Sequence, residues 1–381
     1  MRTLGLYLHV PFCKSKCRYC DFCSFPHPKD DRIEAYLDAL CREIESYGKE
    51  EHPYFEAVRN RTVDTVYFGG GTPTLLSADL LSCVMSTLRR VFSIADDAEI
   101  TVECNPATAD LAYFQALRAM GFNRLSIGAQ SMQDGELRLL GRLHTADDVR
   151  KTVADAREAG FRNVSLDLML GIPGQTKESL ADTLSAVLTL APDHVSAYGL
   201  QIEDGTYFAR HRDELSFPDE DTESAMYRMT AALLSANGIS QYEISNFARP
   251  GFESRHNLRY WRRLDYLGFG LAAHSCMGAE RFANTEDLNR YLTGAWRESR
   301  EVISPHDILA ETVMLGMRLA EGVDFLPLVK QYGEKALAYG DAFSAYIDDG
   351  FVKLDGTRLS FTEEGMYVSN TILSDVLDFE G

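Results

Sequence analysis

Apolar runs and amphipathic stretches alternate along the first 200 residues of the chain. The apolar runs predict strands, and the stretches between them, whose apolar positions recur every three or four residues, predict helices. The predicted strands are Leu4–Val10, Thr65–Gly69, Glu99–Cys104, Arg124–Gly128, Val164–Leu170 and Val195–Leu200. The predicted helices are Asp31–Tyr47, Ala78–Val91, Asp110–Met120, Ala146–Ala159 and Lys177–Leu190. This alternation is typical of a parallel sheet covered by helices, so we expect an α/β fold with a partial, TIM-like (β/α)6 barrel.

The pattern changes in the second half of the chain. A further helix is predicted at Asp219–Asn237, and a loop-rich stretch follows from Tyr242 to Cys276. From about residue 304 the pattern predicts two helices and two short strands, an order that resembles a winged helix: Ile308–Leu319, Leu326–Tyr339, Phe351–Leu354 and Thr357–Phe361. We therefore expect a barrel over residues 1–240, a loop-rich extension over residues 241–300 and a small, mainly helical C-terminal domain over residues 301–381.

An unusual segment follows each of the first five predicted strands. The segments are a cysteine-rich loop after the first strand, then Gly69–Thr74, Asn105–Pro106, Gln130–Ser131 and Gly171–Gly174. In parallel barrels the carboxyl ends of the strands carry the functional residues. The site is therefore expected at this end of the barrel.

Composition and charge restrict the classes of function. The 381 residues carry a net charge of −19, which argues against a large nucleic-acid interface, because phosphate binding needs a basic surface. The apolar runs fall well short of the roughly 18 residues of a membrane span, and the start of the chain lacks a signal-peptide pattern. We therefore expect a cytoplasmic protein that is not integral to a membrane. Disulfides are rare in that compartment. Four scattered cysteines are accordingly expected to be small buried hydrophobic residues: Cys41, Cys83, Cys104 and Cys276.

Three cysteines follow the first predicted strand with the spacing C-x3-C-x2-C, namely Cys13, Cys17 and Cys20. Thiolates are the usual protein ligands of iron–sulfur clusters, and three of them leave one iron of a [4Fe–4S] cluster open. This spacing, with Tyr19 before the third cysteine, resembles the radical S-adenosylmethionine (SAM) superfamily. The resemblance implies that SAM binds the open iron. It also implies that an external electron donor reduces the cluster, which then cleaves SAM to a 5′-deoxyadenosyl radical.

Other interpretations of the cysteines stay open at this stage. Zinc could bind four thiolates if Cys23 joined the set, although structural zinc sites usually pair two knuckles separated by a dozen or more residues. The cysteines could also be unrelated free thiols. Cys23 itself could be a fourth cluster ligand, a nearby redox thiol or a bystander.

Polar residues at later strand ends suit a SAM pocket. The glycine run Gly69–Gly71 lets the backbone approach a ligand closely, although a tight turn alone would also explain it. Side chains at or after later strands would suit the ribose hydroxyls, the carboxylate and the adenine of SAM: Glu103, Gln130, Arg142 and Asp167.

Seven segments resemble the oxygen-independent coproporphyrinogen III oxidase (HemN/HemW-like) family of radical SAM proteins. They read YLHVPFC, GGGTPT, ECNP, RLSIGAQS, LGRLHT, DLMLGIPGQT and YEISNFA, and they start at residues 7, 69, 103, 124, 140, 167 and 242. The resemblance implies a radical SAM barrel with cluster ligands Cys13, Cys17 and Cys20. It places these residues at SAM positions: Tyr7, Tyr19, Gly70, Gly71, Thr72, Glu103, Gln130, Arg142 and Asp167, with a position near His274 completing the pocket.

Three features favour the heme-chaperone branch of this family over its oxidases. Phe22 stands where the oxidases usually carry a fourth cysteine, and only six residues precede Tyr7, whereas the oxidases have an N-terminal extension. The third feature is an HNxxYW motif. Its His256 is a candidate ligand of heme iron, and Tyr260 and Trp261 are candidates to pack on the porphyrin. Nearby arginines could pair with the propionates, and the competing interpretation is a structural loop whose aromatic residues fill the core.

The favoured function is therefore a chaperone that binds heme and delivers it to acceptor hemoproteins, with the cluster and SAM in a supporting or switching role. The alternative is an enzyme, a coproporphyrinogen dehydrogenase that oxidatively decarboxylates two propionates of coproporphyrinogen III. Radical SAM chemistry on another substrate is a third alternative.

Overall fold

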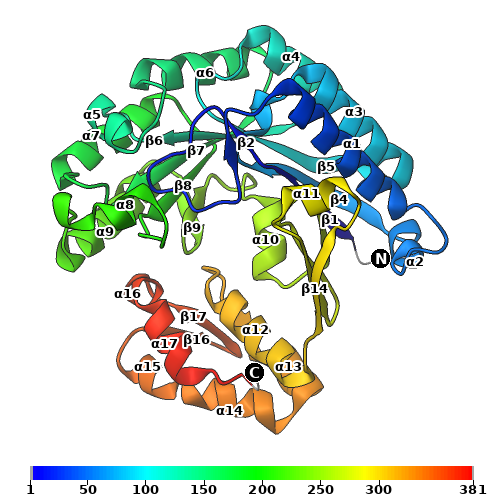
Figure 1. Cartoon of the computed structure of the whole chain (residues 1–381). Helices are drawn as coiled ribbons and strands as arrows, with labels where there is room; N and C mark the ends of the chain where they lie inside the picture. Colours follow the sequence, from blue (N-terminus) through cyan, green and yellow to red (C-terminus); the bar gives the residue numbers. More distant parts are fainter. Residues whose placement is uncertain (1–2, 380–381) are drawn as a thin grey trace.

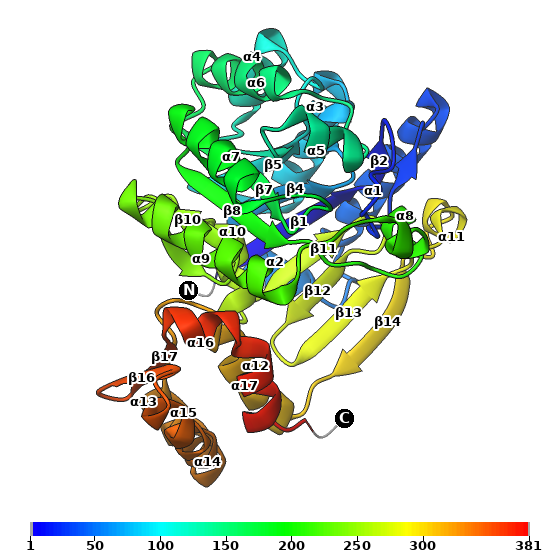
Figure 2. The ribbon, with the colours of Figure 1, turned by 90° about the vertical axis from the view of Figure 1, so that its left-hand side faces the viewer.

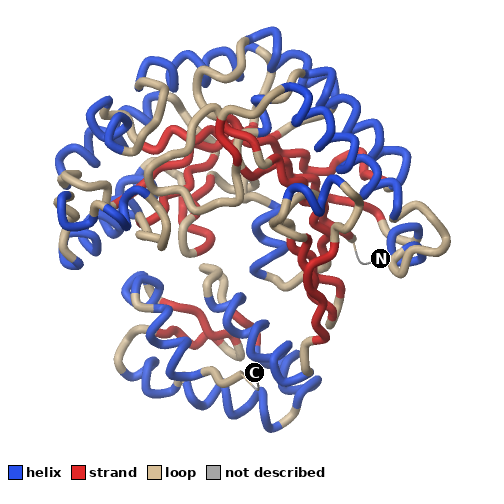
Figure 3. Tube along the Cα trace, in the orientation of Figure 1, coloured by secondary structure: helices blue, strands red, loops and turns tan. Residues whose placement is uncertain are grey.

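A curved sheet with helices on its outer face forms the larger part of the computed structural model, which describes residues 3–379 (Figures 1 and 3). Its six central strands run parallel and lie in sequence order: β1 (Leu4–Val10), β4 (Thr62–Gly70), β5 (Ser93–Cys104), β6 (Arg124–Gln130), β7 (Asn163–Leu170) and β8 (His194–Gly199). The helices between them are α1 (Asp30–Ser46), α2 (Phe55–Arg59), α3 (Ala78–Val91), α4 (Leu111–Met120), α5 (Asp134–Leu139), α6 (Ala146–Glu158) and α7 (Lys177–Thr189). The predicted α/β fold is confirmed.

Burial explains why these strands form. Nearly every residue of β1 and β6 is buried, because the barrel interior covers one face and the helices cover the other. Local signals fix the helix ends. Ser77 accepts a hydrogen bond from the backbone of Leu80 at the start of α3, and Thr145 forms a capping box with Asp148 at the start of α6.

The prediction of a loop-rich segment over residues 241–300 was wrong, because most of this segment adds strands to the sheet. At the β8 edge lie β10 (Asn246–Ala248) and β9 (Ser240–Glu243), both antiparallel. At the β1 edge, β11 (Tyr266–Phe269) pairs in parallel with β1, and three antiparallel strands follow: β12 (His274–Met277), β13 (Glu280–Asn284) and β14 (Arg297–Val302). The helices of this half of the barrel are α8 (Tyr207–Arg210), α9 (Glu220–Ala236), α10 (Arg255–Trp261) and α11 (Leu288–Leu292). The sheet thus has twelve strands among the described residues.

The C-terminal part packs around an apolar core of its own and lies beside the barrel (Figure 2). Its helices are α12 (Pro305–Met317), α13 (Phe325–Tyr332), α14 (Glu334–Ala342), α15 (Ser344–Asp348), α16 (Glu363–Tyr367) and α17 (Ser369–Val376). Its three-stranded sheet contains β15 (Val323–Asp324), β17 (Arg358–Phe361) and β16 (Val352–Asp355). The single helix predicted at 326–339 is broken at Gly333, whose φ of 63° is incompatible with a continuous helix.

Buried charges join the two parts. Glu311 of α12 accepts hydrogen bonds from Arg263 at 2.8 Å and from Arg281 at 2.7 Å. Within residues 3–379, no helix has the length and apolar character needed to cross a membrane.

Candidate functional site

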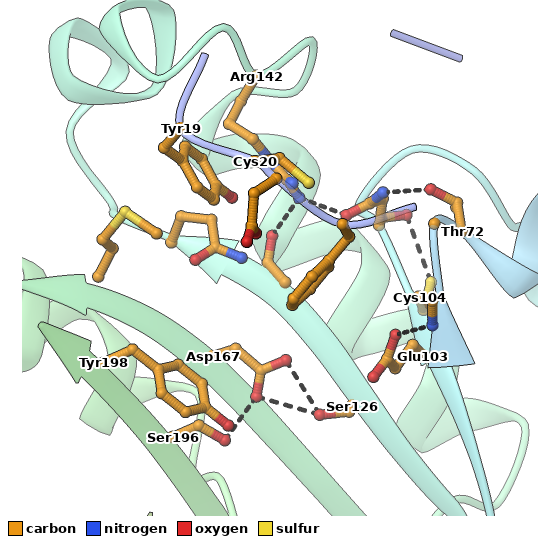
Figure 4. Close-up of a pocket in the computed structure, with 18 of the residues that line it drawn as sticks. Tyr19, Cys20, Thr72, Glu103, Cys104, Ser126, Arg142, Asp167, Ser196 and Tyr198 are labelled. Atoms are coloured by element: carbon orange, nitrogen blue, oxygen red, sulfur yellow. Dashed lines mark hydrogen bonds between the residues drawn. The ribbon is translucent and has the colours of Figure 1, made fainter. Parts of the chain in front are cut away.

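The carboxyl ends of the parallel strands surround a cavity of about 430 Å³ (Figure 4), a volume within the usual range of small-molecule sites. Residues 19–22 of the loop after β1 also line it, and they include the predicted cluster ligand Cys20. Eight residues predicted to contact SAM are found in its wall: Tyr19, Gly70, Gly71, Thr72, Glu103, Gln130, Arg142 and Asp167. Five strand ends and the cysteine loop therefore contribute to one site. Of the segments expected there, Gly171–Gly174 does not line the cavity, and the end of β8 lines it instead.

The cysteine loop is held between two short parallel strands, β2 (Phe12–Cys13) and β3 (Phe25–Pro26). Its backbone is tied down by hydrogen bonds from Phe25 to Pro11 and from His27 to Cys13. His9 of β1 adds a side-chain bond, with its Nε2 2.9 Å from the carbonyl oxygen of Cys23. The loop is thus anchored at both ends and near its last cysteine.

The glycine run after β4 lies directly against this loop. Gly70 has a φ of 116°, a conformation that side chains other than hydrogen disfavour. A Cβ at Gly71 would lie 2.9 Å from the Cys13 sulfur and 2.6 Å from the Phe12 carbonyl oxygen. The Thr72 hydroxyl lies 3.7 Å from the same sulfur. Glycine is therefore required here because the two loops touch.

The three predicted cluster ligands occupy different positions around the loop. Cys13 contacts the glycine run, Cys17 lines an adjoining depression of about 210 Å³, and Cys20 lines the main cavity. Among the described residues, no three side chains of His, Cys, Asp or Glu converge on one metal-ion position. A [4Fe–4S] cluster does not need such convergence, because each thiolate binds a different iron. The donor set fits a cluster with one open iron.

Burial and a neighbouring cation act in opposite directions on these sulfurs. Burial raises the pKa of the Cys13 and Cys20 thiols, so a coordinating metal is what would deprotonate them. The Arg142 guanidinium lies 3.5 Å from the Cys17 sulfur and also donates to the Gly128 carbonyl oxygen at 2.7 Å. A cation held in that position stabilises negative charge on the sulfur.

Two carboxyl groups form the polar wall of the cavity. Glu103 accepts hydrogen bonds from the Gly70 amide at 3.0 Å and from the Tyr67 hydroxyl at 2.9 Å. Burial, with Asp167 nearby, raises the pKa of Glu103 to about 7. Asp167 accepts bonds from the hydroxyls of Ser126 at 3.0 Å and Ser196 at 2.7 Å (Figure 4), and burial raises its pKa as well. Both side chains are therefore fixed in place as acceptors.

Sequence reasoning missed several residues of the wall, among them Phe22, Tyr67, Arg124, Ser126, Ser196, Tyr198 and Asn257. Asn105, which the sequence placed in a segment directly after a strand, lines the cavity as expected. Arg124 is only 1% exposed, and among the described residues its Nε has no hydrogen-bond partner. A buried donor without a partner in a cavity wall fits a site that a bound molecule completes.

Two predicted SAM residues lie outside the cavity lining. The hydroxyl of Tyr7 lies 3.0 Å from Nδ1 of His9, which in turn holds the cysteine loop. His274 is exposed on β12 and is not part of the wall. The structure therefore does not bring His274 to this cavity.

The HNxxYW motif forms the helix α10, not a loop. His256 is 1% exposed, and both of its ring nitrogens are engaged: Nδ1 lies 2.9 Å from the Thr65 hydroxyl and Nε2 lies 2.8 Å from the Tyr260 hydroxyl. Burial lowers the pKa of His256 to about 3. Asn257, the next residue along the helix, lines the cavity. In this conformation neither nitrogen of His256 is free to ligate iron.

The other parts of the predicted heme site are also engaged. Trp261 is half-buried, and the Arg318 guanidinium lies over its ring, 6.0 Å from the ring centre. Three of the four nearby arginines pair with carboxylates: Arg259 with Asp64, Arg262 with Glu321 and Arg263 with Glu311. This surface therefore holds the C-terminal part and the edge of the sheet together.

Known proteins resemble this chain over nearly its whole length. The model of the radical SAM superfamily matches residues 7–187, and that of the HemN C-terminal domain matches residues 303–368. The protein "Heme chaperone HemW" of Bacillus subtilis is 34% identical, over 97% of this chain and 98% of that protein. The HemW of Mycobacterium tuberculosis is 36% identical, over 99% and 95%. The HemW of Escherichia coli is 32% identical, over 97% of each.

A solved structure has the same fold. Coproporphyrinogen III oxidase (HemN) from Escherichia coli, described as a radical SAM enzyme, superposes with a TM-score of 0.84 at 28% identity. The match covers 98% of this chain and 90% of that one. The arrangement of barrel and C-terminal domain is therefore shared with a radical SAM protein.

Proposed function

Because the chain belongs to the HemW family of radical SAM proteins, we propose that it binds heme and transfers it to acceptor hemoproteins. The observation that carries this proposal is the full-length similarity to proteins named heme chaperones, which includes the segment with the HNxxYW motif. The exposed ring of Phe22 supports it. This side chain is 63% exposed and lines the cavity, at a position where the oxidases were expected to carry a cysteine.

Membership of the radical SAM superfamily implies a [4Fe–4S] cluster and SAM as cofactors. We propose that Cys13, Cys17 and Cys20 hold the cluster and that SAM occupies the 430 Å³ cavity. When bound, the pair supplies one-electron chemistry. The chain's own residues then have defined tasks: Arg142 stabilises charge at Cys17, and Glu103 offers carboxylate oxygens fixed by Tyr67 and Gly70.

The HNxxYW motif stays the candidate for the heme site, on the condition that His256 becomes accessible to heme. Burial keeps His256 neutral, which is the form that ligates iron. Ligation requires one ring nitrogen to lose its hydrogen bond, either to Thr65 or to Tyr260, and requires the ring, which is only 1% exposed, to become accessible. Heme binding through His256 therefore predicts that α10 moves away from the sheet. Heme bound only at the cavity mouth predicts no such movement.

A pair of variants separates these two cases. If His256 ligates heme, His256→Ala weakens binding, whereas Tyr260→Phe strengthens it because one ring nitrogen is released. A purely structural role predicts no strengthening by Tyr260→Phe. Heme titration followed by the Soret band measures both, and amide hydrogen exchange over residues 255–261 reports the movement of α10.

The alternative is the oxidase, which the structural match to HemN favours. The decisive experiment supplies anaerobic, cluster-loaded protein with SAM, reductant and coproporphyrinogen III, and separately with heme and an apo-hemoprotein. We expect stoichiometric heme binding and transfer without porphyrinogen turnover. Formation of protoporphyrinogen would refute the chaperone proposal. A cytoplasmic location stays a prediction from the sequence.

A further inference from the structure

Two thiols lie close together on the outer face of the barrel, away from the cavity. Cys41 belongs to α1 and Cys83 to α3, two helices that pack side by side (Figure 1). Both cysteines line the same surface depression. Cys83 is exposed and Cys41 is half-buried, so the prediction that both are buried hydrophobic residues was wrong, whereas Cys104 and Cys276 are buried as predicted.

The helix pair places both cysteines at one surface depression. Cys41 of α1 and Cys83 of α3 line this depression together with Thr87, and the two helices pack against each other there. The Thr87 hydroxyl donates to the Cys83 carbonyl oxygen at 3.1 Å, one helical turn away on α3. Proximity of the two side chains is the first geometric condition for a disulfide.

We propose that Cys41 and Cys83 form a reversible dithiol–disulfide site that a low-molecular-weight disulfide oxidises. The Cys83 thiolate attacks the small disulfide, which forms a mixed disulfide and releases one small thiolate. The Cys41 thiolate then attacks the Cys83 sulfur, which forms the intramolecular disulfide and releases the second small thiolate. The two protons lost by the cysteines go to the two released thiolates, and the small disulfide takes up the two electrons that the cysteines lose.

The order of attack follows from exposure. Cys83 is open to solvent, whereas Cys41 is half-buried and burial raises its pKa to about 11. Thiolate is the reactive form, so Cys41 reacts slowly with small molecules but reacts readily once Cys83 carries the mixed disulfide beside it.

The position of the pair gives oxidation a consequence for the fold. Helix α1 follows the cysteine loop, and α3 follows the glycine run that touches that loop. A disulfide between them would link the first two βα units behind the candidate cluster site. This inference is independent of heme binding and of the chaperone proposal.

Peptide mapping of the cluster-loaded protein tests the proposal. The protein is incubated anaerobically with glutathione disulfide, free thiols are alkylated, and the tryptic peptides are analysed without reduction. We expect a cross-linked species that joins residues 33–42 to residues 62–89, two hydrogens lighter than the separate peptides. It should disappear on treatment with a dithiol reductant, and the melting temperature of the oxidised protein should rise by a few degrees.

Three variants complete the test. With Cys41→Ser, Cys83 should stop at the mixed disulfide with glutathione; with Cys83→Ser, Cys41 should stay reduced. Cys276→Ser, a buried cysteine far along the chain, is the matched control and should keep the cross-link. The proposal is overturned if the unmodified sequence accumulates only glutathionylated Cys83, or if Cys83 pairs with another cysteine. The iron content, measured in parallel, reports separately on the cluster.

Discussion

Gly71 offers a direct test of how the glycine run supports the cysteine loop. In Gly71→Ala the new methyl group would lie 2.6 Å from the Phe12 carbonyl oxygen and 2.9 Å from the Cys13 sulfur, whereas ordinary van der Waals contact begins at 3.4 Å. The φ of Gly71 is not among the positive values, so steric overlap, not backbone strain, is the cause. The cysteine loop must therefore move away from the glycine run.

The size and place of the effect follow from this overlap. Overpacking of a well-filled site costs about 1–3 kcal/mol, which corresponds to a roughly 5- to 150-fold change in an equilibrium constant. Phe12 is fully buried and the loop is anchored at both ends, so the overlap strains the cluster-free protein as well as the cluster site. We therefore expect a lower melting temperature of the cluster-free protein and, because the Cys13 sulfur is displaced, weaker cluster binding.

Anaerobic reconstitution followed by competition with an iron chelator measures this effect. Gly71→Ala should lose iron and sulfide at a chelator concentration that leaves the unmodified protein loaded. Gly135→Ala in α5 is the matched control, because nothing lies within 4 Å of the added methyl group. Equal iron retention by Gly71→Ala and the unmodified protein would refute the reasoning that the two loops support each other.

Three further predictions concern other parts of the molecule. Cys23 packs against the apolar core, so Cys23→Ser should keep its iron, whereas Cys20→Ser should lose it. Loss of iron by both variants would make Cys23 a ligand. Burial raises the pKa of Glu43 from 4.5 to about 7. Between these two pH values the folded protein holds a proton that the unfolded chain releases. The free energy of unfolding should therefore fall by about 3 kcal/mol as the pH rises from about 4.5 to about 7. Urea unfolding of the cluster-free protein at about pH 5 and pH 8 should show a smaller fall in Glu43→Gln, and an unchanged fall would contradict the assignment. Glu311→Ala leaves two arginines without their buried partner and should lower the free energy of unfolding by about 3–5 kcal/mol. Glu321 forms an exposed pair with Arg262, so the control Glu321→Ala should lower it by under about 1 kcal/mol. Equal losses in urea unfolding would show that burial is not the cause.

The sequence was sufficient for the parallel core because burial on both faces leaves a strong signal. The strand at Leu4–Val10 and the helix at Ala78–Val91 have the predicted bounds, since each is an uninterrupted apolar or amphipathic run between clear end signals. The candidate site followed from the same pattern. Glu103 on β5 and Asp167 on β7 lie near the carboxyl ends of buried parallel strands that are separated by β6, so a parallel barrel places both at the same end of the sheet.

The edges of the sheet left no comparable signal. All six residues of β14 are exposed and four of them are charged, so nothing in its composition distinguishes a strand from a loop. The pairing of β11 with β1 joins residues more than 250 positions apart, and only the folded chain shows that the two strands are neighbours. The hydroxyl groups around Asp167 were missed for a similar reason, because Ser126 and Ser196 come from strands other than its own.

The HNxxYW motif shows that assigning the wrong secondary structure to a segment changes the function inferred from it. If the segment were a loop, its side chains could converge on one ligand. In a helix, neighbouring residues diverge by about 100°, whereas residues four apart share a face. His256 therefore points at Thr65 of the sheet, Asn257 points into the cavity, and Tyr260 returns to His256 with its hydroxyl. Heme ligation by His256 and a structural role for His256 thus differ in one physical event, the separation of α10 from β4.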